Sequence, residues 1–505
     1  MTTVEDTAKI PSAFRRWMLL VSVVLATTLY SMTVLIVSVV LPQMQGTLSA
    51  TPDQISWVMT FNILATATVT PLTGWLTARF GWRNVMLNSV LGFVVASILC
   101  GQADSLESLV AYRILQGGFG APLVPLAQAV LLDTFSRRQH GLVTSIYGMG
   151  VVVGPIIGPF LGGYLSELYN WRYAFYMLAP VGILAYVGLW IFINDGGRNE
   201  RTRFDWTGFL ALATAIICLQ LILDRAERLD WYESKEIIIE TAVGAFAFYV
   251  FVFYSLIARN PLLNPRHLLD RNYSLGLVIV FLYGMLNFTP MVMLPPMLKE
   301  VAGYPESVIG TLLAGRGAGA VIGFFLAMWI GKLDPRIGLS VGFSMLAWAG
   351  WYMMGFDMNV TAFDVALAST VQGLAVGILW VPLTVATFAT IDPRYLAETM
   401  SVFHLLRNIG SSIFISLSVT ILIRTSSMNY ARFTEFISHF NPLLDYPQNI
   451  VKFDIGSISG LAAISVELDR QADMIGFLNA FGAFTLASII AVPLVLLVRR
   501  PPKSE

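Results

Sequence analysis

The chain has 505 residues, of which 56% are hydrophobic and only 12% are charged, and its mean hydropathy is +0.70. A soluble globular protein carries about a quarter charged residues, so this composition excludes a water-soluble domain and predicts a protein embedded in lipid. The 31 basic and 31 acidic residues cancel, and we expect no nucleic-acid partner.

Fourteen apolar stretches are long enough to cross a bilayer, since a helical span takes about 20 apolar residues. They contain glycine and proline, which membrane helices tolerate, and they lack the short alternating pattern of a membrane β-barrel. The predicted spans are residues 17–40, 55–77, 85–103, 106–131, 140–163, 173–193, 206–223, 236–258, 273–297, 307–331, 337–356, 362–388, 399–423 and 474–498. The sequence therefore predicts an all-α polytopic membrane protein.

The first span begins after "FRRWMLL", which has the charge of a signal peptide. The apolar run that follows is too long, and no small-residue cleavage site ends it, so we expect an uncleaved helix. Counting Lys and Arg by side predicts that both termini lie in the cytoplasm. Cys100 and Cys218 both fall within spans, and no disulfide framework is expected.

Two phrases recur along the chain. "LYSMTVLIVSVVLPQM" (29–44) and "LYGMLNFTPMVMLPPM" (282–297) share the pattern L-Y-x-M, eight residues, L-P-x-M. The fourth and twelfth spans contain "QGGFGAPLVPL" (116–126) and "QGLAVGILWVPL" (372–383). The recurrences lie in matching spans of two six-helix units, although chance similarity between apolar helices is the alternative.

The repeat predicts three parts. Residues 1–193 form an N-terminal six-helix half, and residues 194–272 carry a two-helix insert with its flanking loops. Residues 273–505 form a C-terminal six-helix half, which includes a long external loop at 424–472. Two such halves are typical of secondary transporters, whose substrate sites lie near the bilayer midplane between repeats.

The stretches "PLTGWLTARFGWR" (71–83), "RILQGGFGAPLVPLAQA" (113–129) and "GPIIGPFLGGYL" (154–165) carry a resemblance to a known family. The chain is similar, over nearly its whole length, to the 14-helix drug:proton antiporters of the major facilitator superfamily. The resemblance implies a major facilitator fold with 14 transmembrane helices and the export of toxic small molecules by a proton-coupled antiporter.

The resemblance also implies a place in the inner (cytoplasmic) membrane and two kinds of partner. Members of the family work with a periplasmic membrane-fusion adaptor and an outer-membrane channel. The stretch "SMNYARFTEFISHFNP" (427–442) resembles the last external loop of the family, so we expect it to dock the adaptor, with a flexible connector as the alternative.

The fifth span carries Gly150, Gly154, Gly158 and Gly162 at intervals of four, together with Pro155. This spacing places the glycines on one helical face, where backbones can approach closely. We expect that face to pack between the two halves as a smooth seam for conformational change.

The loop after the second span contains Gly74, Arg79, Gly81 and Arg83. The family usually has an acidic residue where Ala78 stands here, and that residue helps to lock one conformation by charge pairing. The arginines can therefore serve this conformational motif, or can simply anchor the loop on the cytoplasmic side.

The helix 1 pattern of the family departs at two positions. Its proton-exchanging aspartate corresponds to Thr33, which cannot ionise, and its asparagine corresponds to Ser38. Arg113, which shares a helix face with Gln116, has then lost a neutralising acid. A buried unpaired charge is unfavourable, so a substrate anion is the economical partner. A structural hydrogen-bond hub is the alternative for Arg113.

His404 is the one histidine predicted inside the membrane, and histidine alone titrates near neutral pH. Proton coupling would use His404, a span-end acid such as Asp133, or the proton of the substrate itself, although an inert core histidine is the alternative. Arg316 and Arg407 are either pathway residues or structural hubs. The polar residues at middle depth that we expect to line the pathway are Ser38, Asn62, Gln128 and Asn287.

We therefore predict an exporter of amphipathic compounds that are neutral or anionic, such as fatty acids or weak-acid aromatics. An importer or a lipid flippase on the same fold is the alternative, because fold does not fix function. An enzyme would need a nucleophile–base pair or a metal motif such as H-E-x-x-H, and the four histidines are scattered. We expect no catalytic residues, no metal and no cofactor.

Overall fold

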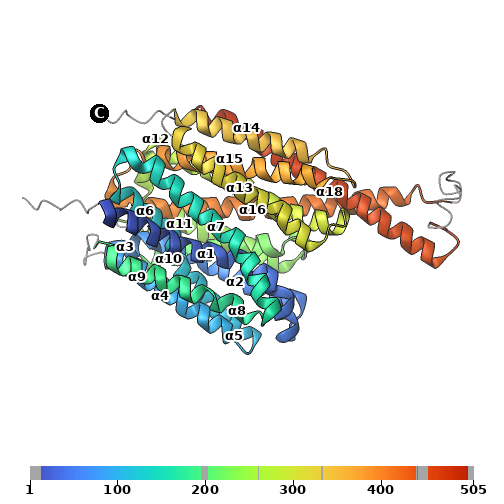
Figure 1. The fold of residues 1–505 in the computed structure, drawn as a ribbon, viewed down its shortest axis with the longest axis horizontal. Coiled ribbons are helices and arrows are strands. Elements are labelled where there is room, and N and C mark those ends of the chain that lie inside the picture. The colour runs from blue at the N-terminus through green and yellow to red at the C-terminus, as the bar shows by residue number, and fades with distance from the viewer. Residues whose placement is uncertain are drawn as a thin grey trace, which may run out of the picture.

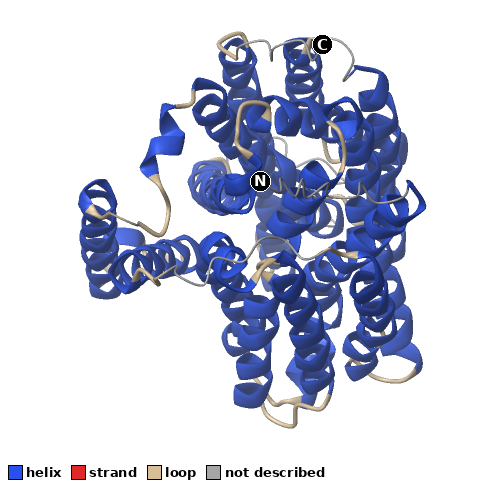
Figure 2. Ribbon diagram, turned by 90° about the vertical axis from the view of Figure 1, so that its left-hand side faces the viewer, coloured by secondary structure: helices blue, strands red, loops and turns tan. Residues whose placement is uncertain are grey.

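Helices form the regular structure of the computed structural model, which describes residues 13–194, 203–259, 261–330, 334–438, 441 and 453–498 (Figure 2). Within these ranges no strand occurs. Thirteen helical segments of the described chain are long and apolar enough to cross a membrane. The prediction of an all-α polytopic membrane protein is confirmed.

The N-terminal half covers the first six predicted spans. Three of these spans are built from consecutive helical pieces. The helices are α1 (Ala13–Thr47), α2 (Pro52–Val69), η1 (Thr70–Leu72), α3 (Thr73–Phe80), α4 (Trp82–Gly101), α5 (Leu106–Gly120), α6 (Leu123–Thr134), α7 (His140–Leu168), α8 (Arg172–Tyr176) and α9 (Leu178–Phe192).

The insert and the C-terminal half follow. Their main helices are α10 (Trp206–Arg225), α11 (Lys235–Ile257), η4 (Pro265–Leu269), α12 (Arg271–Pro296), η5 (Met297–Val301), α13 (Glu306–Ile330), α14 (Pro335–Met353), α15 (Ala362–Phe388), α16 (Leu396–Thr434) and α18 (Ile458–Val495). The predicted span 337–356 corresponds to α14, which is not one of the thirteen segments above.

Polar residues before the helices explain where several of them begin. Thr51 and Gln54 form a reciprocal capping box at the start of α2. Asp205 accepts a hydrogen bond from the Gly208 N–H at 2.9 Å, and Asp270 caps α12 in the same way. Such caps satisfy N–H groups that the first turn of a helix leaves free.

Corresponding helices pair closely in the two halves. The second and fourth spans meet as α2 and α5, where a Cβ added to Gly117 would lie 2.3 Å from the carbonyl oxygen of Asn62. The tenth and twelfth spans meet as α13 and α15, where a Cβ on Gly373 would lie 1.8 Å from the carbonyl oxygen of Arg316. Only glycine permits this backbone approach, and the matching pairs support the interpretation as a repeat.

The glycine face of α7 does not lie where the sequence analysis expected it. It packs against α1 of the same half, where added Cβ atoms would lie 2.8 Å from the Thr28 oxygen at Gly154 and 2.9 Å from the Met32 oxygen at Gly158. Gly150 and Gly162 meet side chains of the same helix. The contact with the other half uses a different side of α7, since Gly148 packs against Phe324 of α13. The expected position between the halves was therefore wrong, and α7 continues as one helix through Pro155.

The bundle has two distinguishable ends, which we call the terminal side and the hairpin side. At the terminal side, where α1 begins and α18 ends, Arg83 donates to the Trp190 carbonyl at 2.9 Å and Arg336 to the Val498 carbonyl at 2.7 Å. At the opposite end, α16 and α18 extend past the other helices, as Figure 1 shows at right. We call this extension the hairpin (424–438 and 453–472).

The hairpin replaces most of the loop that was predicted at 424–472. Residues 439–440 and 442–452 lie outside the described residues. A loop was predicted because the hydropathy falls where the polar residues of this segment begin. A polar helix can nevertheless persist when a partner helix packs against it. Here Tyr430 and Ser465 share a hydrogen bond at 3.0 Å, and Ser426 donates to the carboxylate of Asp473.

The insert covers one junction between the halves. Helix α10 packs against both α2 and α16. On the terminal side, Leu262 shares an apolar cluster with Ala67 of the N-terminal half and Leu405 of the C-terminal half. On the hairpin side, Thr60 of α2 donates to the Asp224 carboxylate at 3.0 Å, and α16 contacts the loop that follows α10. The insert thus bridges the halves at both ends.

Candidate substrate site between the halves

A polar and aromatic group lies where the two halves meet. It comprises Gln128 of α6, Tyr283 of α12, Trp380 of α15, and His404 and Arg407 of α16. The ring centroids of Tyr283 and Trp380 are 5.3 Å apart, and those of Trp380 and His404 are 5.8 Å apart. We call these five residues the central group.

Two hydrogen bonds that cross the interface share the side-chain amide of Gln128. The Gln128 amide nitrogen donates to the Thr384 hydroxyl at 3.2 Å, and its oxygen lies 2.9 Å from Nε2 of His404. Gln128 and His404 are only 1% and 2% exposed. Gln128 lies six residues before α6 ends on the terminal side, or about 9 Å along the axis. These bonds therefore join the halves on the terminal side of the bundle.

Arg407 lies beside this bridge and is partly exposed. Its guanidinium carbon is 5.6 Å from the centroid of the Trp380 ring, and it donates to the Asn408 side chain at 3.1 Å. Tyrosines of both halves, Tyr147 and Tyr283 among them, lie within its electrostatic range. A cation stacked on an aromatic wall between the halves can receive a small negatively charged group.

Arg316 of α13 supplies a second cation. It donates to the side chain of Asn287 at 2.9 Å and also to the Asn287 carbonyl. Its Nη1 atom is buried and has no hydrogen-bond partner among the described residues. Tyr283 lies within electrostatic range of both Arg316 and Arg407, so the two cations flank one region. An unsatisfied buried donor is costly, and an incoming acceptor would relieve that cost.

Arg113 has a different setting, inside the N-terminal half, with 1% of its surface exposed. Its Nε donates to the Val58 carbonyl at 3.0 Å, and its guanidinium donates to the Gln116 side chain. Gln116 in turn donates to Ser97 of α4 at 2.7 Å, and Asn62 of α2 donates to the Arg113 carbonyl at 2.8 Å. Arg113, Gln116 and Asn62 therefore form a hub that joins α2, α4 and α5, which favours the structural interpretation of Arg113.

The two helix 1 positions that depart from the family pattern differ in their exposure to solvent. Thr33 is 2% exposed, and its hydroxyl donates to the Leu29 carbonyl of its own helix at 3.0 Å. Ser38 is exposed. The structure thus places no ionisable group at either position.

The motif after the second span meets the start of α16. A Cβ on Gly74 would lie 2.8 Å from the Cα of Glu398, so α3 and α16 touch by their backbones. Gly81 ends α3 with a φ of +81°, which favours glycine, and the partly exposed Arg79 lies in the last turn before it. Arg83 holds the end of α9, as described above.

Glu398 brings a carboxylate to this contact from α16. It accepts a hydrogen bond from the Asn264 N–H at 2.7 Å, which ties the segment after the insert to α16. His267 lies 3.9 Å away from it. Burial lowers the pKa of His267, so this imidazole is neutral at pH 7 and the contact is not an ion pair.

Comparison with known proteins gives the family. The sequence profile of the Major Facilitator Superfamily matches residues 23–415. The chain belongs to the major facilitator superfamily. This major facilitator protein is 33% identical over 428 residues to the multidrug export protein EmrB of Escherichia coli (strain K12), a match that covers 83% of this chain and 82% of that one.

Two further relatives bear on the fold and the family. The fatty acid resistance protein FarB of Neisseria gonorrhoeae is 29% identical over 475 residues, which are 92% of each chain. The crystal structure of the human organic anion transporter MFSD10 has a TM-score of 0.64 at 12% identity and covers 95% of this chain and 99% of that one. The second likeness shows the fold alone. The fold predicted from the sequence is confirmed.

Sequence reasoning missed Thr384 and passed over Glu398 as a residue at a span end. The repeat contains a signal for the first of them. The letters V-P-L recur at 124–126 and 381–383, and Gln128 and Thr384 stand one or two residues after these two copies. Residues that follow a repeated motif in both halves are candidates to meet at the interface between the halves.

Proposed function

We propose that this major facilitator protein is a proton-coupled exporter in the inner membrane, and that it carries amphipathic compounds that are neutral or bear one acidic group. Its family consists of transporters, and its multidrug-export relatives support an efflux role. The observation that carries the substrate class is Arg407 stacked on Trp380 between the halves. No chemical change of the substrate is part of this proposal.

The charges around the central group favour an anion over a cation. Arg316 and Arg407 flank Tyr283, and one donor of Arg316 is unsatisfied among the described residues. A carboxylate or phenolate would accept hydrogen bonds from these guanidinium groups, while its apolar body would pack on Trp380 and Tyr283. A quaternary ammonium compound would meet like charge, which opposes binding. The name of the relative FarB points in the same direction.

The terminal side is proposed to face the cytoplasm. The arginines Arg15, Arg83 and Arg336 all lie at helix ends on this side, as expected from the bias of Lys and Arg in cytoplasmic segments. The Gln128 bridge then closes the cytoplasmic side. The structure would thus correspond to a state whose substrate site is closed toward the cytoplasm.

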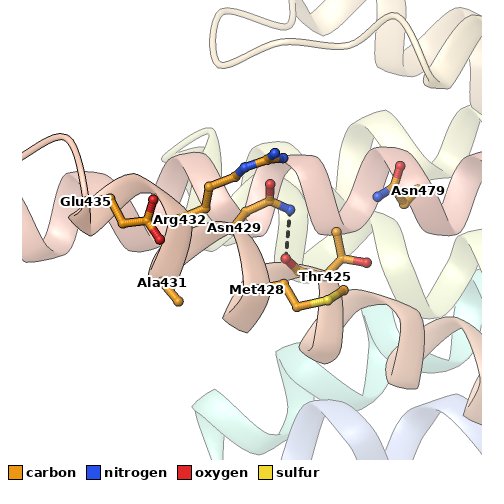
Figure 3. A pocket seen from close by; sticks show the side chains of 7 residues that line it. All are labelled: Thr425, Met428, Asn429, Ala431, Arg432, Glu435 and Asn479. Carbon is orange, nitrogen blue, oxygen red and sulfur yellow. Dashed lines mark hydrogen bonds between the residues drawn. The ribbon is translucent and has the colours of Figure 1, made fainter.

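The hairpin is proposed to dock a periplasmic membrane-fusion adaptor that leads to an outer-membrane channel. A groove of about 480 Å³ lies on it (Figure 3), lined by Thr425, Met428, Asn429, Ala431, Arg432, Glu435 and Asn479. Met428 is 65% exposed, and Arg432 and Glu435 put both signs of charge at the rim. An exposed apolar side chain with a polar rim is typical of a protein interface.

Drug susceptibility tests the substrate class. An efflux-deficient bacterium expressing this protein is compared with the same strain carrying the empty vector, on long-chain carboxylates and on quaternary ammonium compounds of equal chain length. We expect resistance to the carboxylates only, and we expect a proton uncoupler to abolish it. Resistance to the quaternary ammonium series alone would contradict the proposal.

Co-purification tests the docking surface. Arg432→Glu reverses a charge at the groove rim, whereas Arg424→Gln removes a contact with Glu227 outside the groove. We expect the first variant to lose a co-expressed periplasmic adaptor and the second to retain it. Equal retention by both variants would place the adaptor elsewhere.

A further inference from the structure

We propose that the hydrogen bond between His404 and Gln128 is the proton-sensitive contact of the transport cycle, and that His404 is the group that carries the proton. The inference rests on the proposed proton-coupled export and names the residue behind the coupling. According to this proposal, the same hydrogen bond holds the two halves together on the cytoplasmic side and responds to protonation of His404.

The pattern of donors and acceptors fixes the tautomer of His404. The amide nitrogen of Gln128 donates to Thr384, so the amide oxygen faces His404 and accepts. Nε2 of His404 must therefore carry a hydrogen. Nδ1 then has a free lone pair, is buried, and has no hydrogen-bond partner among the described residues. The closed interface holds a neutral imidazole with one basic nitrogen unused.

Few charged groups surround this imidazole. Helix α15 faces it with Trp380 and Thr384, which do not titrate, and α6 faces it with Gln128. The titratable or charged groups of these helices include Arg407 on α16, Tyr273 and Tyr283 on α12, Tyr147 on α7, and the carboxyl groups of Asp133 on α6 and Glu398 on α16. Those of α3, α10 and α18 include Arg79, Asp224, Arg225, Asp469, Arg470 and Asp473. Of these, Arg407 is the charge that acts on His404, and it follows three residues later on the same face.

A second proton on the imidazole would therefore oppose closure. The proton comes from water on the periplasmic side, bonds to the lone pair of Nδ1, and leaves the Nε2 hydrogen in place. The resulting imidazolium lies beside Arg407 and away from solvent, with no acidic hydrogen-bond partner among the described residues, which is an unfavourable arrangement. Opening the interface on the cytoplasmic side hydrates the cation and lets Nδ1 release the proton to cytoplasmic water.

This sequence has the sign that antiport requires. The protonated state favours the conformation open to the cytoplasm, and the neutral state allows the Gln128 bond to form and the site to close toward the cytoplasm. Because the closed state binds the proton more weakly, lower pH shifts the population toward the open state. One proton thus moves inward for each substrate that moves outward.

Reconstituted vesicles separate the proton step from the substrate step. In His404→Gln, we expect uptake driven by a pH gradient and substrate-induced proton movement to be lost. Exchange of labelled for unlabelled substrate needs no protonation, so we expect it to fall much less than the driven uptake. The matched control is His140→Gln, which lies at the start of α7 outside the central group and should keep both activities. Coupled uptake by His404→Gln, or loss of exchange in this variant, would overturn the inference.

A distance measurement tests the same inference without relying on transport. Spin labels at Arg138→Cys and Arg394→Cys, in a background with Cys100→Ser and Cys218→Ser, report the separation of exposed sites at the cytoplasmic ends of the two halves. We expect the wild-type distance to lengthen as pH falls and the His404→Gln or His404→Asn distance to stay short. A wild-type distance that ignores pH would overturn the inference. Wild-type vesicles without any coupled proton movement would instead refute the proposed function itself.

Discussion

Arg407 provides the sharpest test of the substrate class. Arg407→Gln removes the positive charge but retains a polar side chain with hydrogen-bond donors. Arg407→Lys retains the charge but loses the planar guanidinium, whose central carbon lies 5.6 Å from the centroid of the Trp380 ring. The two variants therefore separate charge from shape at one position.

The magnitude follows from the setting of the side chain. A hydrogen bond to a charged group contributes about 1.5–3 kcal/mol, and the partial exposure of Arg407 places it near the lower value. Loss of about 1.5 kcal/mol weakens the binding of a carboxylate roughly tenfold. The lost contact with the aromatic ring contributes about 0.5–1 kcal/mol, so Arg407→Lys weakens the binding about two- to fivefold.

The assay uses two ligands that differ in charge alone. Binding of a long-chain carboxylate and of its neutral primary amide is measured on the purified protein, for the wild type and for both variants. In Arg407→Gln we expect the roughly tenfold loss for the carboxylate and less than about a threefold loss for the amide. Equal losses for the two ligands would refute the assignment of Arg407 to the anionic group.

Three further predictions concern the frame around the site. Arg113→Met should lower the melting temperature, because each broken hydrogen bond of the hub costs about 1–3 kcal/mol. An unchanged melting temperature together with lost carboxylate binding would instead assign the anion site to Arg113. Gly158→Leu should destabilise the protein by about 1–3 kcal/mol, since its Cβ meets backbone at 2.9 Å, whereas Gly163→Ala, whose Cβ has ordinary contact at 3.4 Å, should not; equal melting of the two variants would contradict this packing. Glu398→Gln weakens the hydrogen bond from the Asn264 N–H, which contributes about 1 kcal/mol. A cysteine placed at Leu132 should then react with a thiol reagent about fivefold more. Unchanged labelling would show that Glu398 does not hold the closed state.

The membrane architecture followed from the sequence because it depends on composition and on repetition. Apolar length determines the spans, and a phrase repeated in the first and ninth spans, with a second in the fourth and twelfth, predicts two halves. Neither inference needs to know which way a side chain points. The close pairing of α2 with α5 and of α13 with α15 accords with this interpretation.

The candidate site was harder to predict because depth along a helix can be read from the sequence, whereas the neighbour that a face meets cannot. Arg113 and Arg407 both lie within predicted spans, yet Arg113 contacts residues of its own half and Arg407 lies at the junction of the halves. Likewise, the spacing of Gly154 and Gly158 predicts a close-packed face, but only the packed structure shows that α1 is the partner.

Two positions at which the family has acidic residues are uncharged in this protein, which changes where its ionisable groups lie. Thr33 is bonded within its own helix, and Ala78 leaves no acid in the loop after the second span. The proposal moves proton binding to His404 and moves the carboxylate of the cytoplasmic contact to Glu398. Both replacements come from α16, so the C-terminal half holds the ionisable groups on which this proposal depends.

Uptake into vesicles under an imposed pH gradient tests the central claim most directly. Purified protein is reconstituted, and a labelled long-chain carboxylate is compared with a quaternary ammonium compound of the same chain length. The account predicts that the gradient drives accumulation of the carboxylate, that an uncoupler abolishes it, and that the ammonium compound does not accumulate. Gradient-driven accumulation of the ammonium compound without the carboxylate would contradict it.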